Sequence, residues 1–154
     1  MTCFGLLSQT ECKYEQNSKK ATLKYIASLG LSEQLRWNET EQRVEFKTRF
    51  HHLASFQIKG CKNKVTTLSI KFEAIKGFKY ENSMILYKLM EVSQKLKIDD
   101  FVQILALKKY ELTSKNSDKT IYSISAENET TTYSDIEIRR VLNNSWISIS
   151  KTEN

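Results

Sequence analysis

Several residue types and patterns are missing or scarce in this chain of 154 residues. It has no proline and only 4 glycines. Four dispersed glycines exclude a glycine-rich phosphate loop, and neither a G-x-G-x-x-G pattern nor a P-loop is present. No apolar run approaches the roughly eighteen residues that a membrane-spanning helix needs. With 40% hydrophobic and 27% charged residues, the composition is typical of one soluble globular domain.

Cysteine is also scarce, and the 3 cysteines show no paired spacing. We therefore expect reduced thiols and an intracellular protein, without a preference among nucleus, cytoplasm and organelle. The N-terminal stretch MTCFGLLSQTECKYEQ supports this, because it lacks the basic leader and apolar core of a secretory signal. We accordingly interpret the glycosylation sequons at Asn38, Asn128 and Asn143 as chance matches.

The positive charge is concentrated in the middle of the chain. The formal net charge is +6, and residues 43–120 contain 16 Lys and Arg against 8 Asp and Glu. The segments on either side carry no positive excess. A concentrated basic surface attracts polyanions, of which nucleic acid is the usual one in cells. The alternative is a solvated basic face that only aids solubility.

Hydrophobic periodicity predicts a chain rich in strands. Ser18 and Gly30 are suitable as the cap and stop of a first helix, and Ser134 with Glu137 forms a capping box for a last one. The expected helices cover residues 18–29, 82–97 and 133–142, and the expected strands cover 43–50, 54–60, 64–78, 101–112, 119–127 and 146–150.

This order favours a mainly β fold with flanking helices. Three β segments, a helix and two further strands follow the order of the five-stranded OB-fold, a Greek-key barrel with a helix between strands 3 and 4. A ferredoxin-like sandwich would need a helix between its first two strands, where the sequence shows no helical face. We expect a helical extension packed on the barrel over 1–42, the barrel over 43–133, and a C-terminal helix and tail over 134–154.

Residues 85–126, ILYKLMEVSQKLKIDDFVQILALKKYELTSKNSDKTIYSISA, resemble the second half of bacterial and mitochondrial single-stranded-DNA-binding proteins. The matching positions are Lys88, Leu89, Glu91 and Val92 in a helix, Leu96 and Lys97 in a turn, and Val102 and Ile104 in a strand. Asp99 and Ala106 stand where that family usually has glycine. The resemblance implies an OB-fold protein that binds single-stranded DNA, with the polar segment after residue 107 as a long hairpin loop over the groove.

Binding a single strand without sequence preference requires spaced cations and flat aromatic faces, each stacked base contributing about 1–3 kcal/mol. The tyrosines and tryptophans could equally be packing residues, and the lysines an exposed polar face. The candidate nucleic-acid-binding residues are Arg36, Trp37, Lys47, Arg49, Lys59, Lys71, Lys108, Lys109, Tyr110, Lys115, Lys119 and Tyr122.

Patterns for catalysis are weak, so we predict no enzyme activity, cofactor or metal. His51 and His52 are adjacent and would point to opposite faces of a strand. Asp99 and Asp100 form a turn pair without a third carboxylate at nuclease-like spacing. Cys61 beside Lys62 could have a lowered pKa, but a catalytic cysteine also needs an arranged histidine.

We therefore expect a single-stranded DNA-binding protein, with RNA as a possible ligand because 2′-hydroxyl contacts leave no mark in the sequence. It could form a homo-oligomer or join a replication or telomere complex, and no membrane contact is expected. The alternative is an OB-fold interaction subunit that binds nucleic acid weakly or not at all. Its docking residues would then be Ile136, Ile138, Val141 and Leu142.

Overall fold

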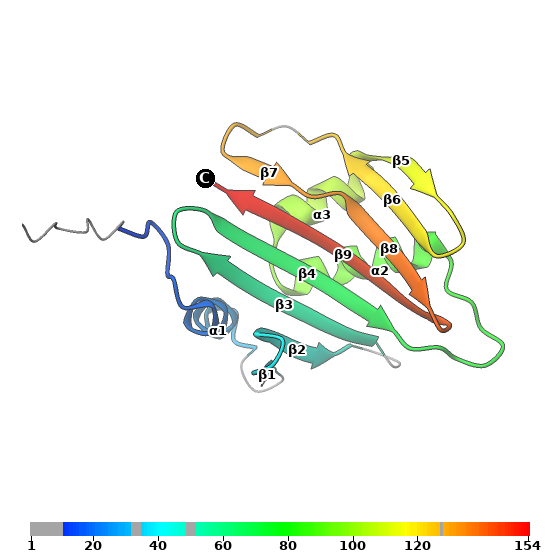
Figure 1. Ribbon diagram of the computed structural model, residues 1–154, viewed down its shortest axis with the longest axis horizontal. Coiled ribbons are helices and arrows are strands. Elements are labelled where there is room, and N and C mark those ends of the chain that lie inside the picture. The colour runs from blue at the N-terminus through cyan, green and yellow to red at the C-terminus, as the bar shows by residue number, and fades with distance from the viewer. Residues whose placement is uncertain (1–10, 32–34, 49–51, 127) are drawn as a thin grey trace, which may run out of the picture.

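The computed structural model describes residues 11–31, 35–48, 52–126 and 128–154. Within them the chain forms a mainly β fold with three helices (Figure 1). In chain order the elements are α1 (Ser18–Ser28), β1 (Arg36–Asn38), β2 (Arg43–Lys47), β3 (His52–Gly60), β4 (Lys64–Phe72), α2 (Asn82–Lys95), α3 (Asp99–Ala106), β5 (Tyr110–Lys115), β6 (Lys119–Ile124), β7 (Thr131–Tyr133), β8 (Ile136–Val141) and β9 (Asn144–Glu153).

The strands form one open antiparallel sheet in the order β1-β2-β3-β4-β9-β8-β6-β5, and β7 pairs with the end of β9. The last strand of the chain lies in the middle of the sheet, where β9 pairs with β4 on one side and β8 on the other. The predicted five-stranded closed barrel is therefore not what these strands form. β1 and β5 are the two edges, and no described strand pair joins them.

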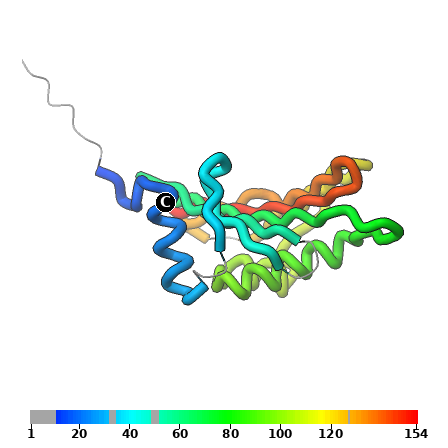
Figure 2. Tube along the Cα trace, turned by 90° about the horizontal axis from the view of Figure 1, so that it is seen from below, coloured from blue at the N-terminus to red at the C-terminus, as the bar shows by residue number. Residues whose placement is uncertain are grey.

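All three helices lie on the same side of the sheet (Figure 2). This placement follows from the alternation of apolar and polar side chains along the strands. On β4, Leu68, Ile70 and Phe72 point to this side and are fully buried against the helices. From α2 they meet Ile85 and Leu89, which recur at the helical interval and are also fully buried. We call this side the covered face and the other side the open face.

The first helix and the strands after it confirm the sequence prediction. Gly30, at φ +70°, follows α1 in the left-handed conformation that suits glycine. The cap, however, is Asn17 rather than Ser18, since the Asn17 side chain accepts the backbone N–H of Lys20. The Ser18 hydroxyl instead donates to the carbonyl of Ile58 on β3 at 2.7 Å. α1 is thus tied to the covered face.

The strand predicted over 101–112 is wrong. Its first half forms α3, in which Phe101, Ile104 and Leu105 share one buried side. When these residues are read as a strand, apolar side chains fall on both faces. The reason is that apolar residues spaced for a helix, with a period of 3.6, do not match the strand period of two. Only Tyr110 and the residues after it are extended, and they form β5 as the edge strand of a hairpin with β6.

The helix predicted over 133–142 is also wrong, so residues 134–154 are not a helix and tail. They contain β8 and β9 instead. Ile136 and Ile138 alternate with exposed or half-buried positions and have no exposed surface, which is the pattern of a strand. The Ser134 hydroxyl does not cap a helix but accepts the backbone N–H of Ser150 at 2.8 Å. Ile136 and Ile138 therefore belong to the core and cannot be docking residues.

Cys12 and Cys61 form a disulfide with an S–S distance of 2.01 Å. The expectation of reduced thiols is therefore wrong for these two cysteines. The bond joins the segment before α1 to the β3–β4 turn, where the Tyr14 N–H also donates to the Cys61 carbonyl at 2.9 Å. Disulfides persist mainly in oxidising compartments, so the intracellular prediction loses its argument from cysteine. None of the described helices has the length and apolar character to cross a membrane.

Candidate nucleic-acid interface

The open face of the sheet is polar at its centre. Ser55, Ser69 and Ser148 lie opposite one another on its middle strands, with Ser55 buried, and Thr67 pairs with Ser150 on the same face. Small hydroxyl side chains leave this surface shallow and rich in hydrogen-bonding groups. At one margin the β1–β2 turn rises above the face (Figure 2). The rest of the described part of this face is not covered by any helix.

A row of large side chains crosses the open face near the end of β4. Cross-strand partners lie on the same face of a sheet, so successive pairings define a line perpendicular to the strands. The pairings are Lys47 with Leu53, Leu53 with Lys71, Lys71 with Trp146, Trp146 with Arg139, and Arg139 with Lys119. We call these six residues the basic row. At about 4.8 Å per strand, it extends over roughly 24 Å.

The centre of the basic row combines a cation with an indole ring. The Nζ of Lys71 lies 5.6 Å from the centroid of the Trp146 ring, within cation–π range. Both side chains are half-buried. Among the described residues, no carboxylate lies within 4.0 Å of Lys71 or of the exposed Lys47. These two charges are therefore not neutralised by an ion pair with the part of the chain that the structure describes.

The other end of the basic row is partly neutralised. Glu137, on β8, forms ion pairs with Arg139 and, at 3.3 Å, with Lys119. Burial raises the pKa of the Glu137 carboxyl, but the hydrogen bonds from Arg139 and Lys119 outweigh it and leave the pKa below its usual value. Glu137 thus stays ionised at neutral pH and fixes the two cations on the open face.

Three of the predicted binding residues lie in this row, namely Lys47, Lys71 and Lys119. Two more occupy the open face away from it. Arg36 pairs with Glu45 at the β1 edge, and Lys59 pairs with Val65 near the β3–β4 turn. The prediction that the basic floor crosses neighbouring strands is consistent with this placement, although the strands form an open sheet.

The predicted aromatic residues lie on the covered face. Tyr110 and Tyr122 contact each other edge to face at 5.4 Å, and the Tyr122 hydroxyl accepts the side-chain amide of Asn82 on α2 at 3.3 Å. Trp37 packs against the core, with Lys19 of α1 at 5.7 Å from its ring. All three rings pack under or beside helices, so the structure does not bring them to the basic row.

The remaining predicted cations are not in the row either. Lys108 and Lys109 lie in the turn from α3 to β5, where Lys108 has φ +50°, and Lys115 ends β5 at the sheet edge. All three are exposed. Arg49 lies outside the described residues. The long polar hairpin loop over a groove is instead the β5–β6 hairpin, closed by a short turn at residues 116–118.

Three members of the basic row were not predicted from the sequence, namely Leu53, Trp146 and Arg139, and the last two carry the ring and a charge. Trp146 precedes Ile147 and Ile149, and the alternation in WISIS already indicated that the tryptophan faces away from those apolar residues. Arg139 was assigned to a helix by the misleading capping box. Had residues 136–140 been read with a period of two, Arg139 would have fallen opposite Ile136 and Ile138.

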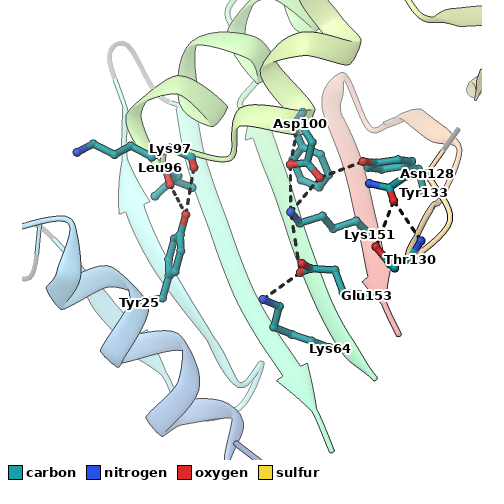
Figure 3. A network of polar contacts seen from close by, with 11 residues as sticks. Tyr25, Lys64, Leu96, Lys97, Asp100, Asn128, Thr130, Tyr133, Lys151 and Glu153 are labelled. Carbon is teal, nitrogen blue, oxygen red and sulfur yellow. Dashed lines mark hydrogen bonds and ion pairs between the residues drawn. The ribbon is translucent and has the colours of Figure 1, made fainter. Parts of the chain in front are cut away.

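A second charged cluster lies on the covered face beneath α3 (Figure 3). The Nζ of Lys151 donates to both oxygens of Asp100, at 3.0 and 2.9 Å, and the Tyr133 hydroxyl donates to the same carboxylate at 3.1 Å. Glu153 pairs with Lys64 at 3.0 Å. Burial, with the negative charge of Asp100, raises the pKa of Tyr133 to about 12, so its hydroxyl stays a donor.

In this covered-face cluster every named charge has a partner of opposite sign. The hydrogen bonds and ion pairs connect the start of α3 with the last residues of β9 and with β7. The predicted turn pair Asp99–Asp100 is thus the first turn of α3, where carboxylates interact favourably with the helix dipole. The arrangement explains how a short helix is held on the sheet.

No protein family, curated protein or solved structure matches this chain significantly. The resemblance to single-stranded-DNA-binding proteins therefore stays a prediction.

Proposed function

We propose that this chain binds single-stranded nucleic acid across the open face of its sheet, along the basic row. The observation that carries the proposal is the alignment of Lys47, Lys71, Arg139 and Lys119 around Trp146 on a face without helices. The proposal no longer depends on a closed barrel. It depends on a flat sheet surface that offers cations in line and one ring among them.

The physical basis is the usual one for sequence-tolerant strand binding. Cations spaced along a line attract the phosphates, and an aromatic ring accepts any base because every base has a flat face. The polar neighbours Ser69 and Ser148 can donate to phosphate or sugar oxygens. Lys47 and Lys71 supply most of the attraction, since the charges of Arg139 and Lys119 are shared with Glu137.

The test is a fluorescence anisotropy titration with labelled oligo-dT, oligo-rU and a duplex over a range of salt concentrations. Affinity for single strands should fall with salt, with a log–log slope of about 2 to 3, because each of up to four contacts contributes about 0.7. The variant Lys47→Ala/Lys71→Ala should bind about tenfold or more weakly at low salt and lose about 1.4 of the slope.

The matched control is Lys24→Ala/Lys62→Ala, which removes the same charge from two exposed lysines, on α1 and in the β3–β4 turn. Equal losses in the two double variants would show that only net charge matters. That result, or a response that is flat with salt, contradicts the proposal. Comparison of the dT and rU titrations assigns the preference between DNA and RNA.

A further inference from the structure

A groove of about 720 Å³ lies at the end of the sheet next to the basic row. The β4–α2 connection, the β5–β6 turn and the β8–β9 turn form its walls, and all three are at the right-hand end of the sheet in Figure 1. We call it the end groove. Arg140 and Ser145 line it, and each is the chain neighbour of a member of the basic row, Arg139 or Trp146. Because neighbouring residues of a strand point to opposite faces, Arg140 and Ser145 face the covered side, and a nucleic-acid strand on the basic row would turn over the end of the sheet to reach the end groove.

The end groove is positively charged. Lys76 and Lys79 on the β4–α2 connection are exposed, and among the described residues no carboxylate lies within 4.0 Å of either. Arg140 reaches in from β8, with one guanidinium nitrogen donating to the Tyr80 carbonyl at 3.3 Å. A guanidinium has five N–H donors, so this anchored side chain retains donors for a ligand. Asp118 is the one acidic residue in the described lining.

The end groove also contains an aromatic ring in a fixed position. Phe78 is 47% exposed, although large apolar side chains are usually better covered. Its backbone is set by a tight turn in which the Phe78 N–H donates to the Ile75 carbonyl at 3.1 Å and Gly77 has φ +76°. The ring meets the buried Tyr80 edge to face at 4.9 Å. Tyr80 thus fixes one side of the Phe78 ring, while about half of the Phe78 surface stays accessible to solvent.

Three cations and an accessible ring in one groove match the chemistry of a nucleotide, which joins an anionic phosphate to a flat base. The volume is within the range of about 300–1,000 Å³ that is typical of small-molecule sites. We propose that the end groove binds the terminal nucleotide of the strand that lies on the basic row, with its base on Phe78 and its phosphate near Lys76 and Lys79. This inference deepens the proposed function and rests on it.

The experiment uses two probes, thymidine 5′-monophosphate and 5′-phosphorylated dT12. NMR amide shifts follow the mononucleotide, and anisotropy follows the oligomer. The variants Phe78→Ala and Lys76→Ala/Lys79→Ala should abolish the mononucleotide shifts at residues 74–80. Phe78→Ala should also weaken dT12 binding by about 5- to 30-fold, the lower part of the usual range for losing one stacked base, and the lysine variant should weaken it through lost phosphate contacts. Phe78→Trp should retain binding.

The matched control is Leu142→Ala, because Leu142 lines the same groove and is 90% exposed but has no ring. It should leave both probes bound as tightly as in the parent. If Phe78→Ala behaves like Leu142→Ala, the end groove binds no base and the inference is wrong, while the basic row is unaffected as a proposal. If the parent binds the mononucleotide through Phe78 but does not bind dT12, the groove is a free-nucleotide site and the proposed function is overturned.

Discussion

The two faces of the sheet use charged residues in different ways. On the covered face Asp100, Lys151, Glu153 and Lys64 pair with one another, and the cluster holds α3 against the sheet (Figure 3). On the open face Lys47 has no such partner among the described residues. Charges that are matched within the chain are explained by the fold, whereas Lys47 on β2 and Lys71 on β4 have no carboxylate partner among the described residues, and the proposed function rests on these two charges.

The comparison also separates the aromatic residues by role. On the covered face the rings of Tyr110 and Tyr122 contact each other, and the Tyr122 hydroxyl accepts a hydrogen bond from the Asn82 side chain. Trp146 on the open face is contacted by a lysine and flanked by small hydroxyl residues. A half-buried indole with cations on both sides is better suited to hold a base than a ring packed beneath a helix.

The largest expected effect breaks the covered-face cluster. Asp100→Ala removes the acceptor of the Tyr133 hydroxyl and leaves the largely buried Lys151 ammonium with only the distant Glu153 carboxylate at 3.9 Å. Removing the close partner of a partly buried charge leaves that charge poorly compensated, so we expect a loss of about 2–3 kcal/mol in the free energy of unfolding. Urea unfolding followed by circular dichroism measures it.

Asp99→Ala is the matched control, because Asp99 precedes Asp100 in the same helical turn but is exposed. It should cost less than about 1 kcal/mol through the helix dipole alone. Equal losses in the two variants would mean that the cluster does not hold α3. Oligonucleotide affinity, measured on the folded fraction, should not change in either variant.

A smaller effect tests the open face. Trp146→Ala should weaken binding of oligo-dT by about 5- to 30-fold, and Trp146→Phe should restore most of it, since a ring rather than the indole N–H is required. Anisotropy titration at fixed salt measures both. Trp37→Ala is the control, because this tryptophan packs against the core near α1. Equal loss of affinity in the Trp37 and Trp146 variants would remove Trp146 from the proposed interface.

Residue patterns predicted the elements whose period was unambiguous. β4 alternates cleanly over Lys64–Phe72, and α2 repeats its apolar residues at helical spacing, so both were found. The residues of α3 were predicted as a strand and those of β8 as a helix. Eight and six residues are too few to separate a period of 3.6 from a period of two. The central position of β9 could not be predicted, since strand order depends on long-range pairing that short patterns do not encode.

The candidate site was predictable to the extent that strand alternation was right. Lys47 and Lys71 were placed on the basic side of their strands, and both lie on the open face. The aromatic partners were not found, because the resemblance directed attention to Tyr110 and Tyr122 near a supposed groove. Which rings face the helices depends on the helix positions, and one of those helices had been read as a strand.

The smallest expected effect refines the comparison at Glu137, the one carboxylate of the described residues that pairs with the basic row. Glu137→Gln should raise affinity for oligo-dT about two- to fourfold at pH 7, because Lys119 and Arg139 lose their internal counter-charge. The pKa of Glu137 is lowered by its hydrogen bonds with Arg139 and Lys119, so the parent carboxylate stays charged at pH values where an ordinary glutamate begins to be protonated. The affinity ratio of variant to parent should therefore be constant above pH 5 and approach one as the pH falls through that lowered pKa. Anisotropy titrations at several pH values, with folding checked by circular dichroism, give this ratio. A ratio of one at pH 7 would mean that the Glu137 end of the basic row does not contact the nucleic-acid strand.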